Sequence, residues 1–194
     1  HVDDDDTQHH VVTLVAGPDP AAPVTVREER APDDAFAVRL SAQPESNVTV
    51  SLEPTVSGVI ALYPDTITFT PTDYGTDVFI SVAGLSDPNL VDEYVEVVVR
   101  SSAAASVVVP VVVEEDDLQD LVVTPVDAVQ PSTGTLHVSE DASPAAFIDV
   151  RLQFQPEGTK GVRVSTGSPY ALVNGEPFVD LFFTTSNFAR PQRV

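Results

Sequence analysis

The segment EYVEVVVR, Glu93–Arg100, decides the fold class of this chain. Val95, Val97 and Val99 fall on one face of an extended chain, whereas a tyrosine, a glutamate and an arginine fall on the other. Alternation with a period of two marks a β-strand that has one face in the core and one in solvent. The segment therefore predicts a half-buried strand.

Similar runs occur along the chain and end at turn signals. They are AFAVRL (35–40), NVTVSL (47–52), TITFT (66–70) and DVFISV (77–82). Proline, glycine, asparagine and aspartate separate the runs, and no segment has the apolar spacing of a helix. About seven strands at a spacing of about twelve residues are typical of an antiparallel β-sandwich. We therefore expect an all-β chain of tandem antiparallel β-sandwiches, immunoglobulin-like in kind.

The sequence also repeats itself. VDDDDTQHHVVT (2–13) returns as VEEDDLQDLVVT (113–124), and VRL (38–40) returns at 150–152. A period of about 112 residues is the size of a small domain and is too long for a helical solenoid repeat. We predict the tail of a preceding repeat at 1–6, a complete sandwich at 7–117 and a second, truncated sandwich at 118–194.

The charge of the chain excludes two classes of partner. The formal net charge is −21, from 30 acidic and 9 basic residues. Nucleic acid and anionic lipid would repel such a chain, so cations are the plausible counterparts. Cysteine is absent, which excludes disulfides and thiolate metal sites. No apolar stretch reaches the roughly 18 residues of a membrane span, so we expect no direct membrane insertion.

Short motifs recur in the same order in both copies of the repeat. V-x-E stands at 26–28 and 138–140, V-x-L-x-x-x-P at 38–44 and 150–156, and an acidic run closes the first copy at 114–117. In this order the motifs resemble the Calx-β domain, a sandwich module of sodium–calcium exchangers that also recurs in tandem in large surface proteins. The resemblance implies a Calx-β-like sandwich in each copy.

The resemblance further implies a calcium ion as cofactor, bound at one end of the sandwich. Carried over by motif, its ligands are Glu28, Asp87, Glu93, Asp116 and Asp117. The sequence has one aspartate, Asp87, where the family pattern has a pair.

The physical chemistry of carboxylates is compatible with this assignment. Calcium takes six to eight hard oxygen ligands in irregular geometry, which suits loop carboxylates. The four consecutive acids at 114–117 repel one another unless a cation neutralises them. The alternative is that the acidic run is solvated and serves only solubility.

Other chemistry has little support in the sequence. No serine lies in a GxSxG elbow, and the adjacent His9 and His10 point to opposite faces of a strand. We therefore expect no enzyme and no zinc site. Asn47–Val48–Thr49 is a sequon in a turn, so Asn47 is a candidate glycosylation site.

With this resemblance we expect a structural or adhesive module of a long extracellular repeat array. The array would be part of a cell-surface filament, appendage or sheath, stiffened by calcium. Its partners would be neighbouring repeats and like chains in a filament or surface layer. The alternative is a calcium-responsive regulatory or carbohydrate-binding module of a larger membrane or secreted protein.

Overall fold

The computed structural model describes residues 7–15, 22–126 and 146–194, and the predicted tail at 1–6 lies outside them. The chain divides into two compact units, His1–Asp87 with Val91–Asp116, and Pro88–Leu90 with Asp117–Val194. Among the described residues every regular element is a strand. The all-β fold class predicted from the sequence is confirmed.

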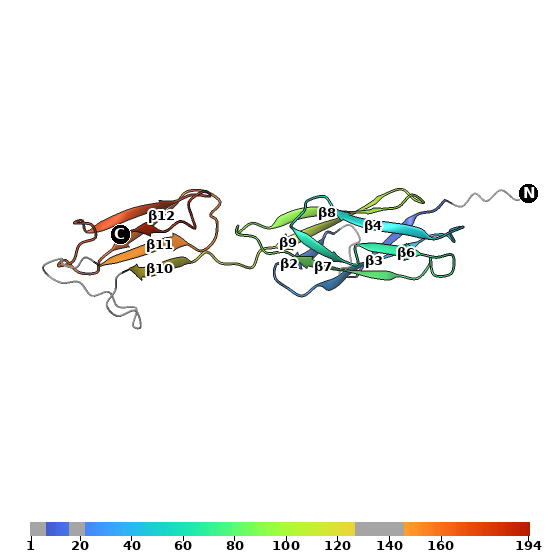
Figure 1. The fold of residues 1–194 in the computed structure, drawn as a ribbon, viewed down its shortest axis with the longest axis horizontal. Coiled ribbons are helices and arrows are strands. Elements are labelled where there is room, and N and C mark those ends of the chain that lie inside the picture. The colour runs from blue at the N-terminus through green and yellow to red at the C-terminus, as the bar shows by residue number, and fades with distance from the viewer. Residues whose placement is uncertain (1–6, 16–21, 127–145) are drawn as a thin grey trace, which may run out of the picture. The chain divides into compact units, whose positions relative to one another are not determined.

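One sheet of the first unit is antiparallel throughout. Its strands β3 and β7 are labelled in Figure 1. Its order is β1 (His10–Leu14), β3 (Asp33–Leu40), β7 (Val78–Gly84) and β5 (Ile60–Tyr63). β3 lies between β1 and β7, and its residues Ala35, Phe36, Ala37 and Val38 are all buried instead of alternating. The alternation expected for this strand fails at two positions. The pairing of β3 with β7 is irregular between Asp34 and Phe36, where Ala35 joins the core, and Ala37 is buried as well.

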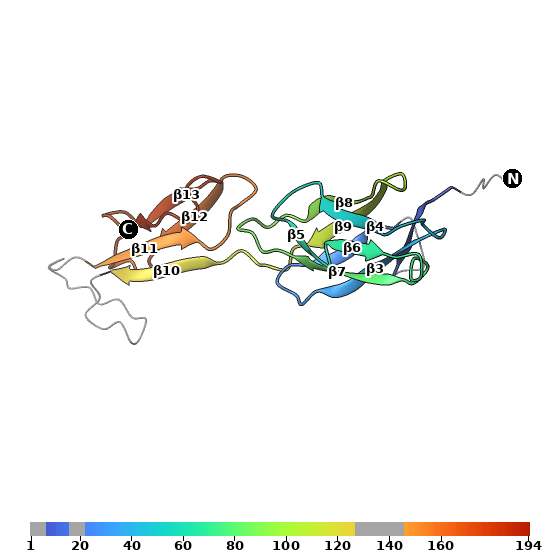
Figure 2. The same ribbon diagram turned by 45° about the vertical axis from the view of Figure 1, so that its right-hand side comes forward.

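The other sheet of the first unit contains the segment from which the fold was predicted (Figure 2). Its order is β2 (Val24–Arg27), β9 (Val107–Glu114), β8 (Glu93–Arg100), β4 (Val48–Pro54) and β6 (Thr66–Phe69). β2 runs parallel to β9, and the remaining neighbours are antiparallel. Val95, Val97 and Val99 of β8 are buried, as predicted. They join residues of the first sheet, such as Phe36 and Ile80, in one core.

Two features of the first unit concern its sheet edges. β1 pairs with β3 in one sheet and β2 pairs with β9 in the other, so the chain changes sheets between Leu14 and Val24. Pro110 lies one residue before Val111, where the pairing of β9 with β2 begins. Pro110 precedes the residues of β9 that pair with β2, so within the described residues its missing N–H group costs that ladder no hydrogen bond.

The second unit has two smaller sheets. The first is β10 (Leu121–Val126), β11 (Phe147–Leu152) and β14 (Gln192–Arg193), and the second is β12 (Lys160–Ser165) with β13 (Phe178–Phe183). A small core lies between them, and its buried side chains are Val150, Leu152, Leu181, Phe183 and Val194.

The two units share a turn in atomic detail. In the first unit the Thr70 N–H donates to Asp73 Oδ1 at 2.6 Å, and in the second the Thr184 N–H donates to Asn187 Oδ1 at 2.6 Å. The aromatic residue after each turn then accepts from a strand: the Leu40 N–H donates to the Tyr74 carbonyl at 2.8 Å, and the Leu152 N–H to the Phe188 carbonyl at 2.9 Å. The sequence repeat therefore corresponds to a repeated local structure.

Candidate cation site

Three strand ends of the first unit meet around Glu28. This residue follows β2, forms an isolated parallel bridge with Gly84 at the end of β7, and donates its N–H to the Glu114 carbonyl at 3.4 Å. A Cβ atom on Gly84 would lie 2.6 Å from the Arg27 carbonyl oxygen and 2.8 Å from a methyl group of Val113. Only glycine lets the end of β7 approach Arg27 and Val113 so closely, so Gly84 keeps β7 beside Glu28.

The carboxylate of Glu28 is buried, and only one of its two oxygens accepts a hydrogen bond. The side chain is 2% exposed. Oε2 accepts a hydrogen bond from the Asp87 N–H at 3.3 Å, whereas Oε1 is buried and has no hydrogen-bond partner. A buried carboxylate oxygen without a partner is costly, so this atom needs a proton or a cation.

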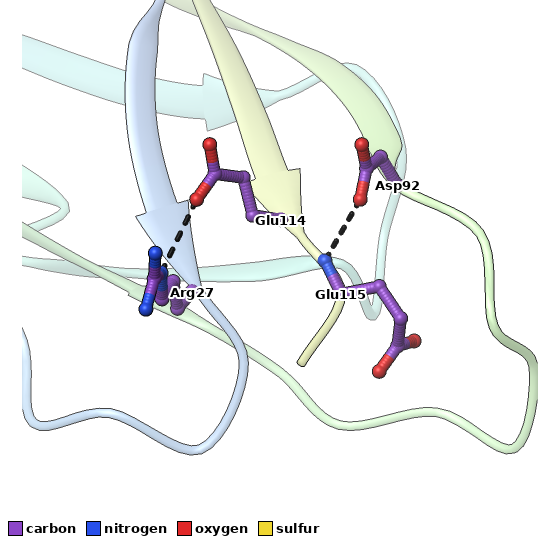
Figure 3. A network of polar contacts seen from close by, with 4 residues as sticks. All are labelled: Arg27, Asp92, Glu114 and Glu115. Carbon is purple, nitrogen blue, oxygen red and sulfur yellow. Dashed lines mark hydrogen bonds and ion pairs between the residues drawn. The ribbon is translucent and has the colours of Figure 1, made fainter. Parts of the chain in front are cut away.

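Two further carboxylates face this oxygen-rich end. Each of Glu28, Asp87 and Glu115 offers an oxygen, and these oxygens all lie within 4.8 Å of one another. The Glu115 N–H donates to Asp92 Oδ1 at 2.9 Å, which holds the chain at the end of β9 beside the residues that precede β8 (Figure 3). Glu114 belongs to a different contact, because its Oε2 accepts from Arg27 Nε at 3.2 Å (Figure 3).

The surroundings raise the pKa of Glu28 from 4.5 to about 7. Burial is the main cause, since it removes the charged form from water. Repulsion from Glu115, Glu93 and Asp87 raises the pKa further, and the hydrogen bond from the Asp87 N–H opposes the rise. Ionisation of Glu28 beside these acids is therefore unfavourable unless a cation neutralises their charge.

The structure brings together only part of the predicted ligand set. Glu28 and Asp87 belong to the group, and Glu93 is close enough to affect the pKa of Glu28 without belonging to it. Asp116 is exposed, and Asp117 is counted with the second unit. These two acids form a separate group with Glu115 because the three are consecutive.

Sequence reasoning missed Glu115, although a signal for it existed. Val111 and Val113 of β9 are buried, and Glu115 continues their alternation toward the same side. Asp116 has the opposite parity and is exposed. Glu115 is the first residue after β9, so it still follows the alternation of the strand, whereas Asp117 has the same parity but lies two residues further on and does not join Glu28.

The donor set suits a hard divalent cation. All three side chains present carboxylate oxygens, and each can bind through one oxygen or both, so they supply much of a calcium shell of about six to eight oxygens. The oxygens come from separate strand ends, and calcium tolerates such irregular geometry better than magnesium does.

The remaining candidate residues lie away from this group. Asn47 is exposed in the turn before β4, so glycosylation there remains a prediction. His10 is buried, with Nδ1 2.9 Å from the Ala105 carbonyl oxygen and Nε2 2.9 Å from Ser101 Oγ, so both ring nitrogens have structural partners. That the chain is not an enzyme also remains a prediction.

Comparison with known proteins gives structural likenesses only. No family model and no curated protein matches the sequence. The E. coli chaperone DraB is similar at 6% identity and a TM-score of 0.38, over 76% of this chain and 91% of that chain. The periplasmic chaperone SfaE is similar at 6% identity and a TM-score of 0.38, over 95% of this chain and 84% of that chain. The CsuC–CsuE chaperone–tip adhesion subunit complex of Acinetobacter baumannii is similar at 10% identity and a TM-score of 0.38, over 94% of this chain and 95% of that chain.

These findings correct the resemblance to Calx-β domains. The named neighbours are chaperones, one of them from chaperone–usher pili, and no family model matches. The function expected from the resemblance falls with it. That function was a structural or adhesive array with filament, sheath and glycoprotein character, and its regulatory or carbohydrate-binding alternative falls too. The physical reason is that motifs such as V-x-E and V-x-L-x-x-x-P mark strands and turns that many β-sandwiches need, so their order does not single out one family.

The expected partner and location can be compared with the descriptions of these neighbours. SfaE is described as periplasmic, and CsuC is bound to a tip adhesion subunit. A location outside the cytoplasm and a protein partner are consistent with these neighbours, whereas the cell surface and like chains in a filament are not specifically indicated. Within the described residues, no helix is long and apolar enough to cross a membrane.

Proposed function

We propose that the first unit is a calcium-binding β-sandwich whose ion is held by Glu28, Asp87 and Glu115. The observation that carries this proposal is the buried Oε1 of Glu28, which has no hydrogen-bond partner and belongs to a group of three carboxylates. An exposed acidic run would be solvated and would leave no such atom. The cation replaces the missing hydrogen-bond partner and neutralises the mutual repulsion of the acids.

Binding would fasten one end of the sandwich. Glu28 follows β2, Asp87 follows β7 and Glu115 follows β9, so one ion connects three chain segments that are distant in sequence. Only the folded unit assembles these ligands, and an ion that binds only the folded state stabilises it. The function of the site is therefore calcium-dependent ordering of this end of the first unit.

The proposed site fits a location where calcium is abundant. Calcium sites in extracellular modules have dissociation constants of about 10⁻⁴–10⁻³ M. Calcium outside the cell would fill such a site, whereas the much lower free calcium of a cytoplasm would leave it largely empty.

Thermal unfolding of the whole chain tests the proposal. Calcium at about a hundredfold excess over its dissociation constant contributes about 2.7 kcal/mol. For a domain of about 100 residues this raises the Tm of the first unit by roughly 10 °C or more over that in chelator. Glu28→Gln should abolish the rise, because it removes the central charge and leaves the shape of the side chain.

Glu45→Gln is the matched control. Glu45 is exposed in the turn before β4. The antiparallel pairing of β3 with β7 places this turn at the end of the sandwich opposite Asp87. A calcium-dependent rise that persists in the Glu28→Gln protein, or that the Glu45→Gln protein loses equally, would show that calcium acts through general charge screening and would refute the site.

A further inference from the structure

Strand β9 of the first unit is apolar on both of its faces. Its inward positions are buried valines of the core. Its outward positions are apolar as well, and they are Val108, Pro110 and Val112. A strand with one face in solvent normally carries polar residues on that face, whereas a strand that is apolar on both faces is typical of a sheet covered on both sides. Val108 is nevertheless 49% exposed, so the outer face of β9 lacks such a cover within the described residues.

The neighbouring strand β8 continues this apolar surface. Val98 lies opposite Val108, and Tyr94, which is 59% exposed, lies opposite Val112. These two pairs form two apolar rows across the strands, and one further row lies between them. We call the three rows together the outer strip, and its residues are Tyr94, Glu96, Val98, Val108, Pro110 and Val112.

The outer strip is bounded by polar positions on both sides. Beside β8 the outward residues of β4 are polar, and Glu53 among them lies opposite Val98. Beside β9 the outward residues of β2 are Thr25 and Arg27. The strip is therefore two strands wide. Because neighbouring strands lie about 5 Å apart, this width is about 10 Å with the side chains, which is the diameter of one α-helix and too narrow for a second sheet.

Glu96 places a carboxylate in the middle of the outer strip. It lies opposite Pro110 in the row between the two apolar rows, and the Tyr94 hydroxyl donates to its Oε1 at 3.5 Å. Glu53 at the border pairs with Arg100 at 3.7 Å, whereas Glu96 forms no salt bridge in the part of the chain that the structure describes. A partner that covers this carboxylate without supplying a cation would leave a desolvated charge, so the strip selects a partner with a basic side chain.

We propose that the outer strip binds an amphipathic helix of a protein partner, with a lysine or arginine midway between two aliphatic residues. Rows on a strand face repeat about every 7 Å, and helical residues four positions apart rise by about 6 Å. Aliphatic side chains four positions before and after the basic residue therefore meet the two apolar rows, and the basic side chain meets Glu96. The net charge of −21 favours such a basic partner over a second copy of the chain. The strip contains none of the proposed calcium ligands, so this inference is independent of the calcium site.

Titration of the whole chain with a helical peptide tests the inference. The probe is an alanine-rich peptide of about 20 residues, long enough to be helical by itself, with a central arginine and a leucine four positions before and after it. The readouts are the binding isotherm and the NMR signals of the valine methyl groups. We expect saturable binding at one peptide per chain, with shifts of the Val98, Val108 and Val112 methyl signals and unchanged signals at Val162 of the second unit.

Matched protein variants separate pairing at Glu96 from general attraction between a basic peptide and an acidic chain. Glu96→Gln should weaken binding about tenfold, because the covered charge pair is lost. Glu45→Gln removes the same charge from the exposed turn before β4 and should change binding by no more than about twofold at physiological salt. Val98→Thr/Val112→Thr should weaken binding about tenfold, since each substitution removes an apolar methyl group.

Peptide variants test the same contacts without any change to the protein. A glutamate in place of the arginine, or serines in place of the leucines, should weaken binding about tenfold or more. The inference is overturned by equal losses in the Glu96→Gln and Glu45→Gln proteins, by peptide variants that bind as tightly as the original, or by methyl shifts confined to other faces. Methyl shifts of the outer strip that depend on chain concentration without peptide would show that a second copy occupies the strip, and would also overturn it.

Discussion

Glu28 accepts a hydrogen bond from the backbone N–H of Asp87 at 3.3 Å, through Oε2 alone. The contact joins the residue after β2 to a residue after β7, 59 positions away in sequence. It satisfies one oxygen of a buried carboxylate and leaves Oε1 without a hydrogen-bond partner. The proposed cation binding and the stability of the unit therefore make opposite demands on Glu28. The negative charge that would bind a cation destabilises the unit when no cation is bound.

The first prediction follows from that opposition. In chelator at pH 8, Glu28→Gln should raise the Tm of the first unit by several degrees, because it removes a buried charge repelled by neighbouring acids. In saturating calcium the order should reverse, with the natural protein the more stable. Differential scanning calorimetry in both conditions measures this. A lower Tm of the variant in chelator would indicate that the Glu28 carboxylate is stabilising by itself.

The second prediction concerns pH. The pKa of Glu28 is about 7 in the folded protein and 4.5 ordinarily, so the folded state retains a proton that the unfolded chain has lost. Stability from this group is complete below about pH 4.5 and is lost as pH rises to about 7. Urea unfolding in chelator should show the natural protein losing stability relative to Glu28→Gln across this window. A constant difference would contradict the raised pKa.

The third prediction separates two adjacent acids. Glu115→Gln should weaken calcium binding by about tenfold or more, because ligand charge sets affinity in such sites. Asp116→Asn removes the same charge from an exposed neighbour and should change the affinity by no more than about twofold at physiological salt. Isothermal titration calorimetry on both variants gives the ratio. Equal losses would mean that the acidic run acts as a diffuse charge.

The fourth prediction concerns Gly84. Gly84→Ala places a Cβ 2.6 Å from the Arg27 carbonyl oxygen, which forces β7 away from the end of β2. We expect a loss of about 1–3 kcal/mol in the free energy of unfolding of the first unit, together with weaker calcium binding. Gly75→Ala is the control, since its added Cβ meets nothing within 4 Å. Equal effects of the two substitutions on urea unfolding would remove the role given to Gly84.

The strands were predictable because their cause is local. Side chains of an extended chain point to alternate sides, so the spacing of Val95, Val97 and Val99 predicted a buried face without knowledge of the partner strands. The repeat also showed in the sequence, and its two turns at Thr70 and Thr184 proved alike in hydrogen bonding. The identification of the family was wrong, since short strand-end motifs report on sandwich construction and not on ancestry.

The membership of the candidate site was decided by tertiary structure. The sequence indicated Glu28 and Asp87 but passed over Glu115 in favour of Asp116 and Asp117, because four consecutive acids look alike until the end of β9 places Glu115 beside Glu28 and Asp87. The raised pKa of Glu28 has the same origin, since burial and the approach of Glu115, Glu93 and Asp87 depend on β2, β7 and β9 ending together. Residue order alone determined which segments are strands, because alternation is a property of neighbours along the chain. Which carboxylates meet was set by pairing between strands far apart in sequence, where a shift of one residue would turn each side chain to the other face.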